Sequence, residues 1–453
     1  MENNKLNHFT VGDPTSGPFI LVLEDGAQIT SEDRAMLQAL YSRSPASVLS
    51  HLDKLKEVGS GKFMDQFYVG YGHKSIGDCG STTIFIENIS MFVAKAIQDW
   101  ALYSGQEVST RYVDFTKAPF SEPLSLAENN PQDWLRKFYV ESMPILKEDL
   151  KKRFPIKEGE KETVYEKAIA ARAFDILRGF LPSGAQTSIA WTTNLRQAAD
   201  KLAYLRVHPL EEVRNIASMI DEALKKAHPN SFNHKIYPMS EEYRAKYMKD
   251  DYYFNPEKLE NEVRLVGNSI DKEMQEKCRE IIESRPDKTE LPKSLSEIGT
   301  LQFEFSLDFG SFRDLARHRA VTQRMPLLTP RFGFHSWYYN QLEESLSVKA
   351  KELISKIESW WTEQEEKGVD KPTLQYYLPM GFRVPCRLTG DIPALVYLVE
   401  LRTGITVHAT LREVSHQMGS IIENLGFKVY LDMTDAEHFD VKRGNQDIVA
   451  KSA

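Results

Sequence analysis

The sequence predicts a mixed α/β (α+β) fold in which one domain occurs twice in tandem. The chain has 453 residues, enough for two or three domains with buried cores. A strand followed by a helix is predicted in the first half and again in the second half. Two further pairs of landmarks recur in the same order, and such self-similarity indicates an internal repeat.

The first strand and helix are predicted from side-chain periodicity. Residues 81–87 are rich in β-branched and aromatic side chains, as strands are. Apolar side chains then recur three or four residues apart between Ile89 and Trp100, the spacing of a helix face.

The second strand and helix follow the same plan. Residues 301–307 alternate strictly between apolar and polar side chains. Phe309, Phe312 and Ala316 then recur at helical spacing, and Asp308 is the predicted N-cap of this helix.

The later landmarks are a Leu-Pro pair and a Leu-Arg pair in each half. From Pro182 to Arg206 the separation is 206 − 182 = 24 residues, and from Pro379 to Arg402 it is 402 − 379 = 23. We therefore predict a tandem duplication in three segments. They are a first repeat at 1–235, a charged, partly helical connector at 236–289 and a second repeat at 290–453.

Composition excludes several classes of protein. The 57 Lys and Arg against 65 Asp and Glu give a net charge of −8, which disfavours a nucleic-acid partner. The 3 cysteines lie far apart, so neither a disulfide framework nor a metal site is predicted. The sequence shows no export signal or membrane span, and we expect a cytoplasmic protein.

The sharpest local motif is Arg317-His318-Arg319 at the end of the second predicted helix. Two guanidiniums beside an imidazole suit a planar, anionic ligand. A solvated helix end, where cations complement the helix dipole, is the alternative.

Two polar segments of the first half are weaker candidates. Glu107, Ser109 and Arg111 alternate and would project to one side of an extended segment, where Ser109 and Arg111 could clamp a phosphate, although a polar edge strand would look the same. His73 and Ser75 follow a glycine, where a local turn with satisfied side chains is the alternative.

Order and spacing together resemble the flavin-dependent thymidylate synthases, the ThyX family. Its pattern is His-x-Ser and Glu-His, a strand, a helix ending in Arg-His-Arg, a Ser-x-Arg-Tyr segment, and later Leu-Pro, Leu-Arg and Glu-Ile-Arg. The first repeat matches most of this pattern, with Glu212-Val213-Arg214 at the last element, while Glu-His and Arg-His-Arg have become Asp78-Cys79 and Asp99-Trp100-Ala101. The second repeat keeps Arg-His-Arg and has Leu327 and Thr329 at the Ser-x-Arg positions.

The resemblance implies two domains, each a small, mostly antiparallel sheet with packed helices. It implies methylation of dUMP to dTMP with methylenetetrahydrofolate, using FAD as cofactor and NADPH as reductant. Arg317 and Arg214 match the residues that stabilise charge on the pyrimidine. The substrate-binding matches are Glu107, Ser109, Arg111 and Arg412. The cofactor-site matches are His73, Ser75, Arg206, His318, Arg319 and Arg402.

The losses in the two repeats are complementary, and family members assemble their sites across a homotetramer. The resemblance therefore implies a composite site and a homodimer that forms a pseudo-tetramer. Two alternatives stay open at this point: a flavin enzyme acting on another pyrimidine nucleotide, and a non-catalytic nucleotide-binding homologue.

Overall fold

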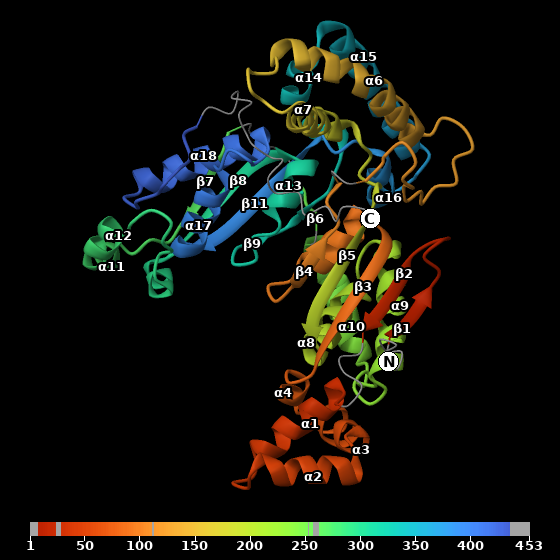
Figure 1. Ribbon diagram of the computed structural model, residues 1–453, viewed down its shortest axis with the longest axis vertical. Helices are drawn as coiled ribbons and strands as arrows, with labels where there is room; N and C mark the ends of the chain where they lie inside the picture. Colours follow the sequence, from red (N-terminus) through yellow and green to blue (C-terminus); the bar gives the residue numbers. More distant parts are fainter. Residues whose placement is uncertain (1–7, 24–28, 111–112, 252, 257–261, 435–453) are drawn as a thin grey trace. The chain divides into compact units, whose positions relative to one another are not determined.

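The computed structural model divides the chain into two compact units (Figure 1). The first comprises Met1–Tyr112 and Gln186–Asp251, and the second comprises Val113–Ala185 and Tyr252–Ala453. The residues that the structure describes are 8–23, 29–110, 113–251, 253–256 and 262–434. Each unit holds an antiparallel sheet with packed helices, which confirms the predicted fold class.

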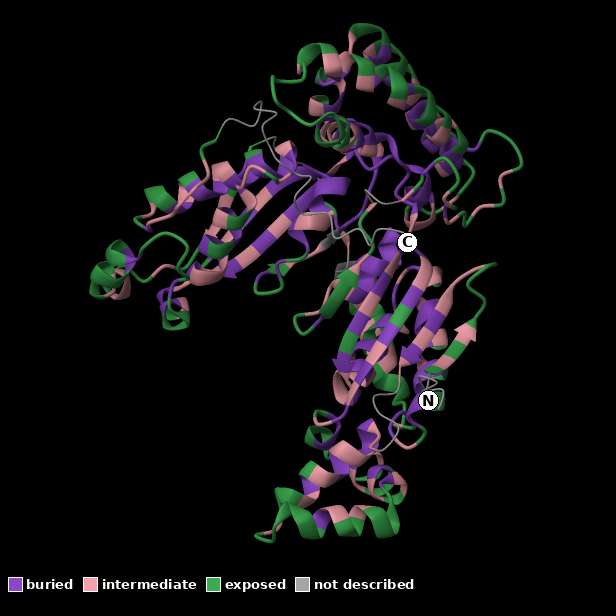
Figure 2. Cartoon of the chain, viewed as in Figure 1, coloured by how far each residue is buried: buried purple, intermediate pink, exposed green. Residues whose placement is uncertain are grey.

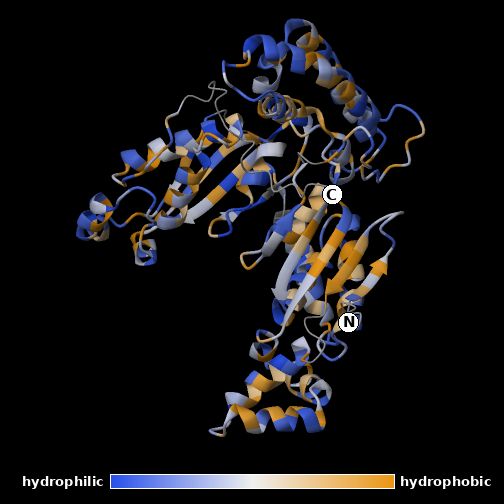
Figure 3. Ribbon diagram, in the orientation of Figure 1, coloured by the Kyte–Doolittle hydropathy of each residue, from blue (hydrophilic) through white to orange (hydrophobic). Residues whose placement is uncertain are grey.

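The sheet of the first unit has the strand order β1-β2-β3-β5-β4, and every pairing is antiparallel. Its central strand, β3, alternates buried residues with more exposed ones (Figure 2). The strand β2 is apolar throughout (Figure 3). The strands are β1 His8–Gly12, β2 Phe19–Leu23, β3 Ser81–Ser90, β4 Ser104–Glu107 and β5 Gln186–Asn194. The α-helices are α1 Ser31–Tyr41, α2 Val48–Val58, α3 Gly61–Phe63, α4 Lys74–Gly77, α5 Met91–Gln98, α8 Leu195–Leu205, α9 Glu211–Ala227 and α10 Pro238–Asp251, and η1 Met64–Gly70 is a π-helix.

The helix predicted at 89–100 is α5, and it begins later than the periodicity indicates. The strand β3 continues to Ser90 because a bulge lies between Ile86 and Ile89, where Asn88 has a φ of 56°. Ser90 then caps α5, since its hydroxyl accepts a hydrogen bond from the Val93 amide at 3.3 Å.

The sheet of the second unit has the order β7-β8-β11-β9. The predicted strand is β8, and Asp308 caps the helix α13 as predicted, accepting from the Ser311 amide at 2.9 Å. The strands are β6 Tyr253–Phe254, β7 Arg264–Asn268, β8 Thr300–Asp308, β9 Thr322–Gln323, β10 Met325–Pro326 and β11 Arg383–Asp391. The α-helices are α6 Pro131–Arg153, α7 Glu162–Leu177, α11 Lys272–Lys277, α12 Arg279–Ser284, α13 Phe309–Leu315, α14 Ser336–Asn340, α15 Glu344–Glu366, α16 Lys371–Leu374, α17 Ile392–Arg402 and α18 Ala409–Asn424. The 3-10 helices are η3 Arg178–Phe180, η4 Lys293–Ile298, η5 Pro330–Phe332 and η6 Gln375–Tyr377.

The two sheets repeat one arrangement. The strands β2-β3-β5-β4 of the first unit match β7-β8-β11-β9 of the second unit in order along the chain and in order across the sheet. The segment predicted as the connector therefore contributes a strand to the second sheet, because β7 pairs with β8 as β2 pairs with β3. The repeat boundaries themselves stay a prediction.

One hydrogen bond between two helix starts occurs in both units with its acidic and hydroxyl partners exchanged. In the first unit the cap Ser90 donates its hydroxyl to Glu212 at 2.6 Å. In the second unit the cap is Asp308, and Thr410 donates its hydroxyl to it. Each pair joins the start of one helix to the second residue of another, α9 or α18. This exchange is the pattern expected of a duplicated domain that has kept a contact while its residues changed.

The Leu-Pro turns of both halves lie in the second unit and pair with each other. Ser183 donates its amide to the Leu378 carbonyl at 2.8 Å, and Met380 donates to the Leu181 carbonyl at 2.9 Å. Because Ser183 and Met380 each follow the proline of their own turn, the two bonds are reciprocal. Such reciprocity is typical of an isologous dimer contact, made here within one chain.

Candidate functional site

The Arg317-His318-Arg319 motif lies in the turn that follows α13. His318 points inward and is 8% exposed, whereas Arg317 and Arg319 are exposed. Gln323 holds the turn, because its side-chain amide donates to the Leu315 and His318 carbonyls at 3.2 Å each. The motif therefore presents two guanidiniums to solvent, and Gln323 fixes the backbone of the turn that carries them.

His318 is held by Arg402, which ends α17. The Arg402 Nε donates to Nε2 of His318 at 2.7 Å, and its Nη2 donates to the Asp314 carbonyl at 2.8 Å. Burial, together with the Arg402 charge, lowers the pKa of His318 to about 3. The imidazole is thus neutral near pH 7, and because Nε2 accepts, its proton is on Nδ1. The structure brings together His318 and Arg402, two of the predicted cofactor residues.

Asp314 lies one helical turn before Arg317 and was missed by the sequence reasoning. Its carboxylate is 3.5 Å from Nη2 of Arg317 and 3.8 Å from Nη1 of Arg178. Burial alone would raise its pKa, but Arg178, Arg317 and Arg402 hold the pKa of Asp314 below the ordinary value. The three-residue spacing from Arg317 is a signal that could have indicated this ion pair.

A buried polar network supports α13 from its other end. The Asp308 carboxylate is fully buried and accepts hydrogen bonds from the Tyr338 hydroxyl at 2.8 Å and from Thr410. His408 faces the Ser311 and Thr410 hydroxyls at 3.2 and 2.9 Å. These contacts join α13, α14 and α18, so the helix that precedes the motif has little freedom to shift.

Arg412 is 7% exposed, and its guanidinium is engaged by backbone oxygens. Its Nε donates to the Thr403 carbonyl, and its Nη2 donates to the carbonyls of Asp432 and Thr434, at 2.6, 2.6 and 2.5 Å. Arg412, predicted as a substrate residue, is thus buried and holds the segment around Asp432 through backbone hydrogen bonds.

The predicted phosphate clamp lies on and after β4 in the first unit. Glu107 accepts a hydrogen bond from the Gln98 side chain at 3.1 Å, and Ser109 is exposed. Arg111 lies outside the described residues.

The predicted arginines Arg206 and Arg214 lie at the end of α8 and the start of α9. Arg206 forms an ion pair with Glu241 at 3.4 Å. Arg214 donates from Nη1 to the His208 and Pro209 carbonyls at 2.7 and 2.8 Å. These bonds use one nitrogen of the Arg214 guanidinium and fix it against the loop that joins the two helices.

His73 and Ser75 are exposed and lie near the beginning of β3. There Ser81 pairs with Asn194, whereas Glu107 pairs with Ile189, five residues along the same strand (194 − 189 = 5). At about 3.3 Å per residue, this separates Glu107 from that end of the sheet by about 17 Å. The structure does not bring His73 and Ser75 together with Glu107.

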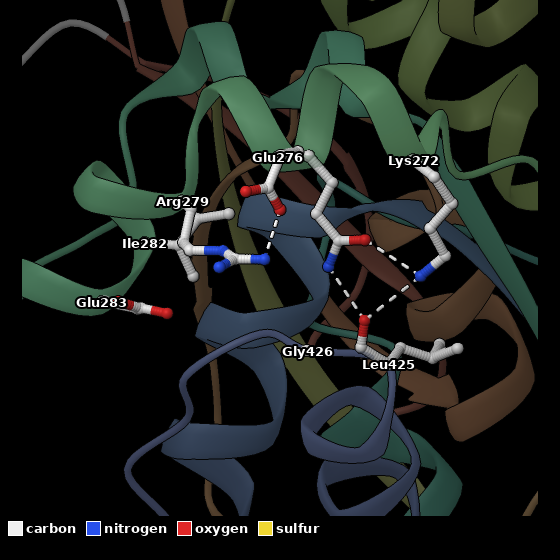
Figure 4. A pocket seen from close by; sticks show the side chains of 8 residues that line it. Lys272, Glu276, Arg279, Ile282, Glu283, Leu425 and Gly426 are labelled. Carbon is white, nitrogen blue, oxygen red and sulfur yellow. Dashed lines mark hydrogen bonds and ion pairs between the residues drawn. The ribbon is translucent and has the colours of Figure 1, made fainter.

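The second unit also has a surface pocket of about 430 Å³, between the segments 272–283 and 425–426 (Figure 4). Gln275 and Lys272 both donate to the Leu425 carbonyl in its wall, at 2.8 and 3.4 Å. Arg279 and Glu276 form an ion pair at its edge. Four of its polar side chains are thus engaged, and no predicted site residue lines it; the four are Lys272, Gln275, Glu276 and Arg279.

The buried histidines of the second unit predict a dependence of stability on pH. The folded-state pKa is about 3 for His318 and, because of burial and Arg178, about 4 for His408, against an ordinary value of 6.5. Below pH 6.5 the unfolded chain therefore binds more protons than the folded one, and stability is lost as pH falls toward 4.

We expect each histidine to contribute a slope of about 1.4 kcal/mol per pH unit in that window. Urea unfolding at several pH values measures it. The His318→Gln variant should show a shallower slope, and the exposed His73→Gln variant should keep the wild-type slope. Equal slopes in wild type and His318→Gln would contradict this assignment.

Within the described part of the chain, no helix is both long and apolar enough to cross a membrane.

The chain is similar in sequence to several known proteins. The sequence model of the Thy1 family, described as thymidylate synthase complementing protein, matches residues 28–230. This confirms the predicted resemblance for that segment.

A UPF0159 protein of Chlamydia muridarum is 24% identical over 435 residues, covering 83% of this chain and 82% of its own length. A UPF0159 protein of Thermoplasma acidophilum is 21% identical, covering 87% of this chain and 93% of its own. The crystal structure of a UMP/dUMP methylase, PolB from Streptomyces cacaoi bound with 5-Br dUMP, is 18% identical, with a TM-score of 0.32, and covers 47% of this chain and 93% of that one.

Proposed function

We propose that this protein is a thymidylate synthase-like enzyme that methylates dUMP to dTMP, with methylenetetrahydrofolate as carbon donor, FAD as cofactor and NADPH as reductant. The observation that carries the proposal is the outward pair Arg317 and Arg319 with His318 and Arg402 locked behind it. The family match over residues 28–230 supports the same reaction class.

The donor set of the motif suits FAD. Two exposed guanidiniums are groups that bind a pyrophosphate through charge-assisted hydrogen bonds. Arg317, Arg319 and Arg402 would hold the cofactor on this side, and bound FAD would supply the hydride. The residues of this chain would orient the nucleotide and balance negative charge on its carbonyl oxygens.

The first half supplies the proposed phosphate clamp, Ser109 and Arg111, together with Glu107 as a further substrate residue, and also Arg214. Both of these carbonyl contacts of Arg214 are made by Nη1, so neither of them uses Nε or Nη2. A guanidinium fixed at one nitrogen can present the others to a pyrimidine oxygen at low cost in side-chain entropy.

The test is a visible spectrum of the purified protein with FAD and then dUMP, followed by an assay of dTMP formation with methylenetetrahydrofolate and NADPH. We expect flavin bands that shift on addition of dUMP, and turnover. Flavin binding without dTMP would favour a reaction on another pyrimidine nucleotide. A protein that binds dUMP and no FAD would be a nucleotide-binding homologue.

The clamp makes a separate prediction. Replacing Arg111 by alanine should weaken dUMP binding about ten- to hundredfold, because one charge-assisted contact to a phosphate contributes about 1.5–3 kcal/mol. Isothermal titration measures this, and the Lys117→Ala variant, which removes a positive charge a few positions later in the sequence, is the control. An unchanged dissociation constant for Arg111→Ala would refute the clamp.

We also propose that two chains associate. Each half keeps motif residues that the other has lost, so the working set is not repeated within a chain. Light scattering of the active fraction should give the mass of a dimer. Turnover confined to a monomeric fraction would overturn this part of the proposal.

A further inference from the structure

Asp314 is in contact with three arginines around the Arg317-His318-Arg319 motif. Its carboxylate pairs with Arg317 at 3.5 Å on the outer side and with Arg178 at 3.8 Å on the inner side. Its backbone carbonyl accepts from Arg402 at 2.8 Å, and Arg402 in turn holds His318. One residue thus links an exposed arginine of the motif to the buried part of the unit.

Arg178 anchors this arrangement from another part of the sequence. It begins η3, in the Leu-Pro turn of the first half, and its side chain is 13% exposed. Its Nη2 donates to the Ser311 hydroxyl at 3.0 Å, so the guanidinium contacts α13 at both Ser311 and Asp314. A planar guanidinium fixed at two points holds the last turn of the helix in place.

The equivalent position of each partner, in the opposite half of the chain, carries a residue that cannot form this ion pair. Arg178 is four residues before Pro182, and four residues before Pro379 lies Gln375. Asp314 is three residues before Arg317, and three residues before Asp99, which stands where the motif would begin in the first half, lies Ala96. The sequence-equivalent pair, Gln375 and Ala96, can form no ion pair, and it accompanies the half whose Arg-His-Arg motif is lost. A pair that served only general stability would not be expected to follow the motif in this way.

We propose that Arg178 and Asp314 are positioning residues that hold Arg317 and the Arg402–His318 pair in the orientation that binds a planar, anionic ligand. This inference rests on the proposed function for the identity of that ligand. An untethered arginine side chain must be ordered when the ligand binds, and the ion pair orders it beforehand. The halves of the chain are thus interdependent, since a first-half arginine orients the second-half motif.

The test gives each position the residue that the other half carries there. Arg178→Gln and Asp314→Ala should each weaken FAD and dUMP binding about tenfold, and the double variant should be about as weak as either single variant, because both break one link. Asp314→Glu should restore most of the affinity. The control is Arg153→Gln, which removes a second-unit arginine bound to the Gln341 carbonyl at 3.0 Å, far along the sequence from α13. Independent, additive losses, or an equal loss in the control, would overturn the proposal.

A second readout needs no ligand. Phenylglyoxal modifies accessible guanidiniums, and mass spectrometry gives the rate at each arginine. In Asp314→Ala and Arg178→Gln, Arg317 should react about two- to fivefold faster, the range for loss of an exposed ion pair, while Arg319 in the same molecule keeps its rate. Equal changes at Arg317 and Arg319, or none, would refute the positioning role. If the wild type binds neither FAD nor dUMP, the proposed function fails while this measurement still decides the positioning role.

Discussion

Replacing Asp308 by alanine is expected to lower the free energy of unfolding by about 3–5 kcal/mol, the range for breaking a buried charged network. The carboxylate is fully buried and serves the Ser311 amide, the Tyr338 hydroxyl and the Thr410 hydroxyl together. Without the carboxylate, these three buried donors on α13, α14 and α18 have no acceptor. Each then loses the hydrogen bond that replaced its contact with water when the chain folded.

Urea unfolding of matched variants measures this effect. Asp391 is the control, because it caps α17 through the Ala394 amide at 2.9 Å at the end of β11 and is only half-buried. Asp391→Ala should lose about 1 kcal/mol, the usual contribution of an N-cap. Tyr338→Phe, which removes one donor, should lose about 1–1.5 kcal/mol and should fold even if Asp308→Ala does not. An Asp308→Ala variant no less stable than Asp391→Ala would contradict the network.

Replacing Arg317 by alanine is expected to lower the turnover number of the proposed reaction about 10²- to 10³-fold, as loss of one group that stabilises developing charge does. The guanidinium is 54% exposed and pairs with Asp314 at 3.5 Å, and because an exposed ion pair contributes little to stability, the unfolding free energy should stay within about 0.5 kcal/mol of wild type.

Steady-state kinetics with dUMP measures the change. The Arg313→Ala variant removes the same charge one turn earlier on α13 and is the control, for which we expect near wild-type turnover. Equal losses in both variants would show that general charge, and not the position of Arg317, is responsible.

The secondary structure around the motif could be predicted because its causes are local. The alternation at 301–307 and the cap at Asp308 depend on neighbours along the chain, and both match the structure. The helix at 89–100 was placed too early because the bulge at Asn88 arises from pairing of β3 with β5, about a hundred residues later.

The compact units could not be predicted from the order of the repeats. Residues 113–185 belong with the second unit because their Leu-Pro turn pairs with the turn at 375–382. Those hydrogen bonds join backbone groups, which carry no side-chain signal in the sequence.

The sequence by itself determined the identity of the chemical groups: two guanidiniums beside a histidine, a polar clamp segment and the duplicated order of strands and helices. The tertiary structure alone decided which arginines remain open. Arg412 matches a substrate residue in sequence, yet its guanidinium is taken by carbonyls at Thr403, Asp432 and Thr434. Arg178 belongs to no motif, yet it contacts α13 at Ser311 and Asp314. The sequence shows where each guanidinium is. Whether that guanidinium can bind a ligand depends on whether oxygens from distant parts of the chain already accept its hydrogen bonds, and the packing of the fold decides this.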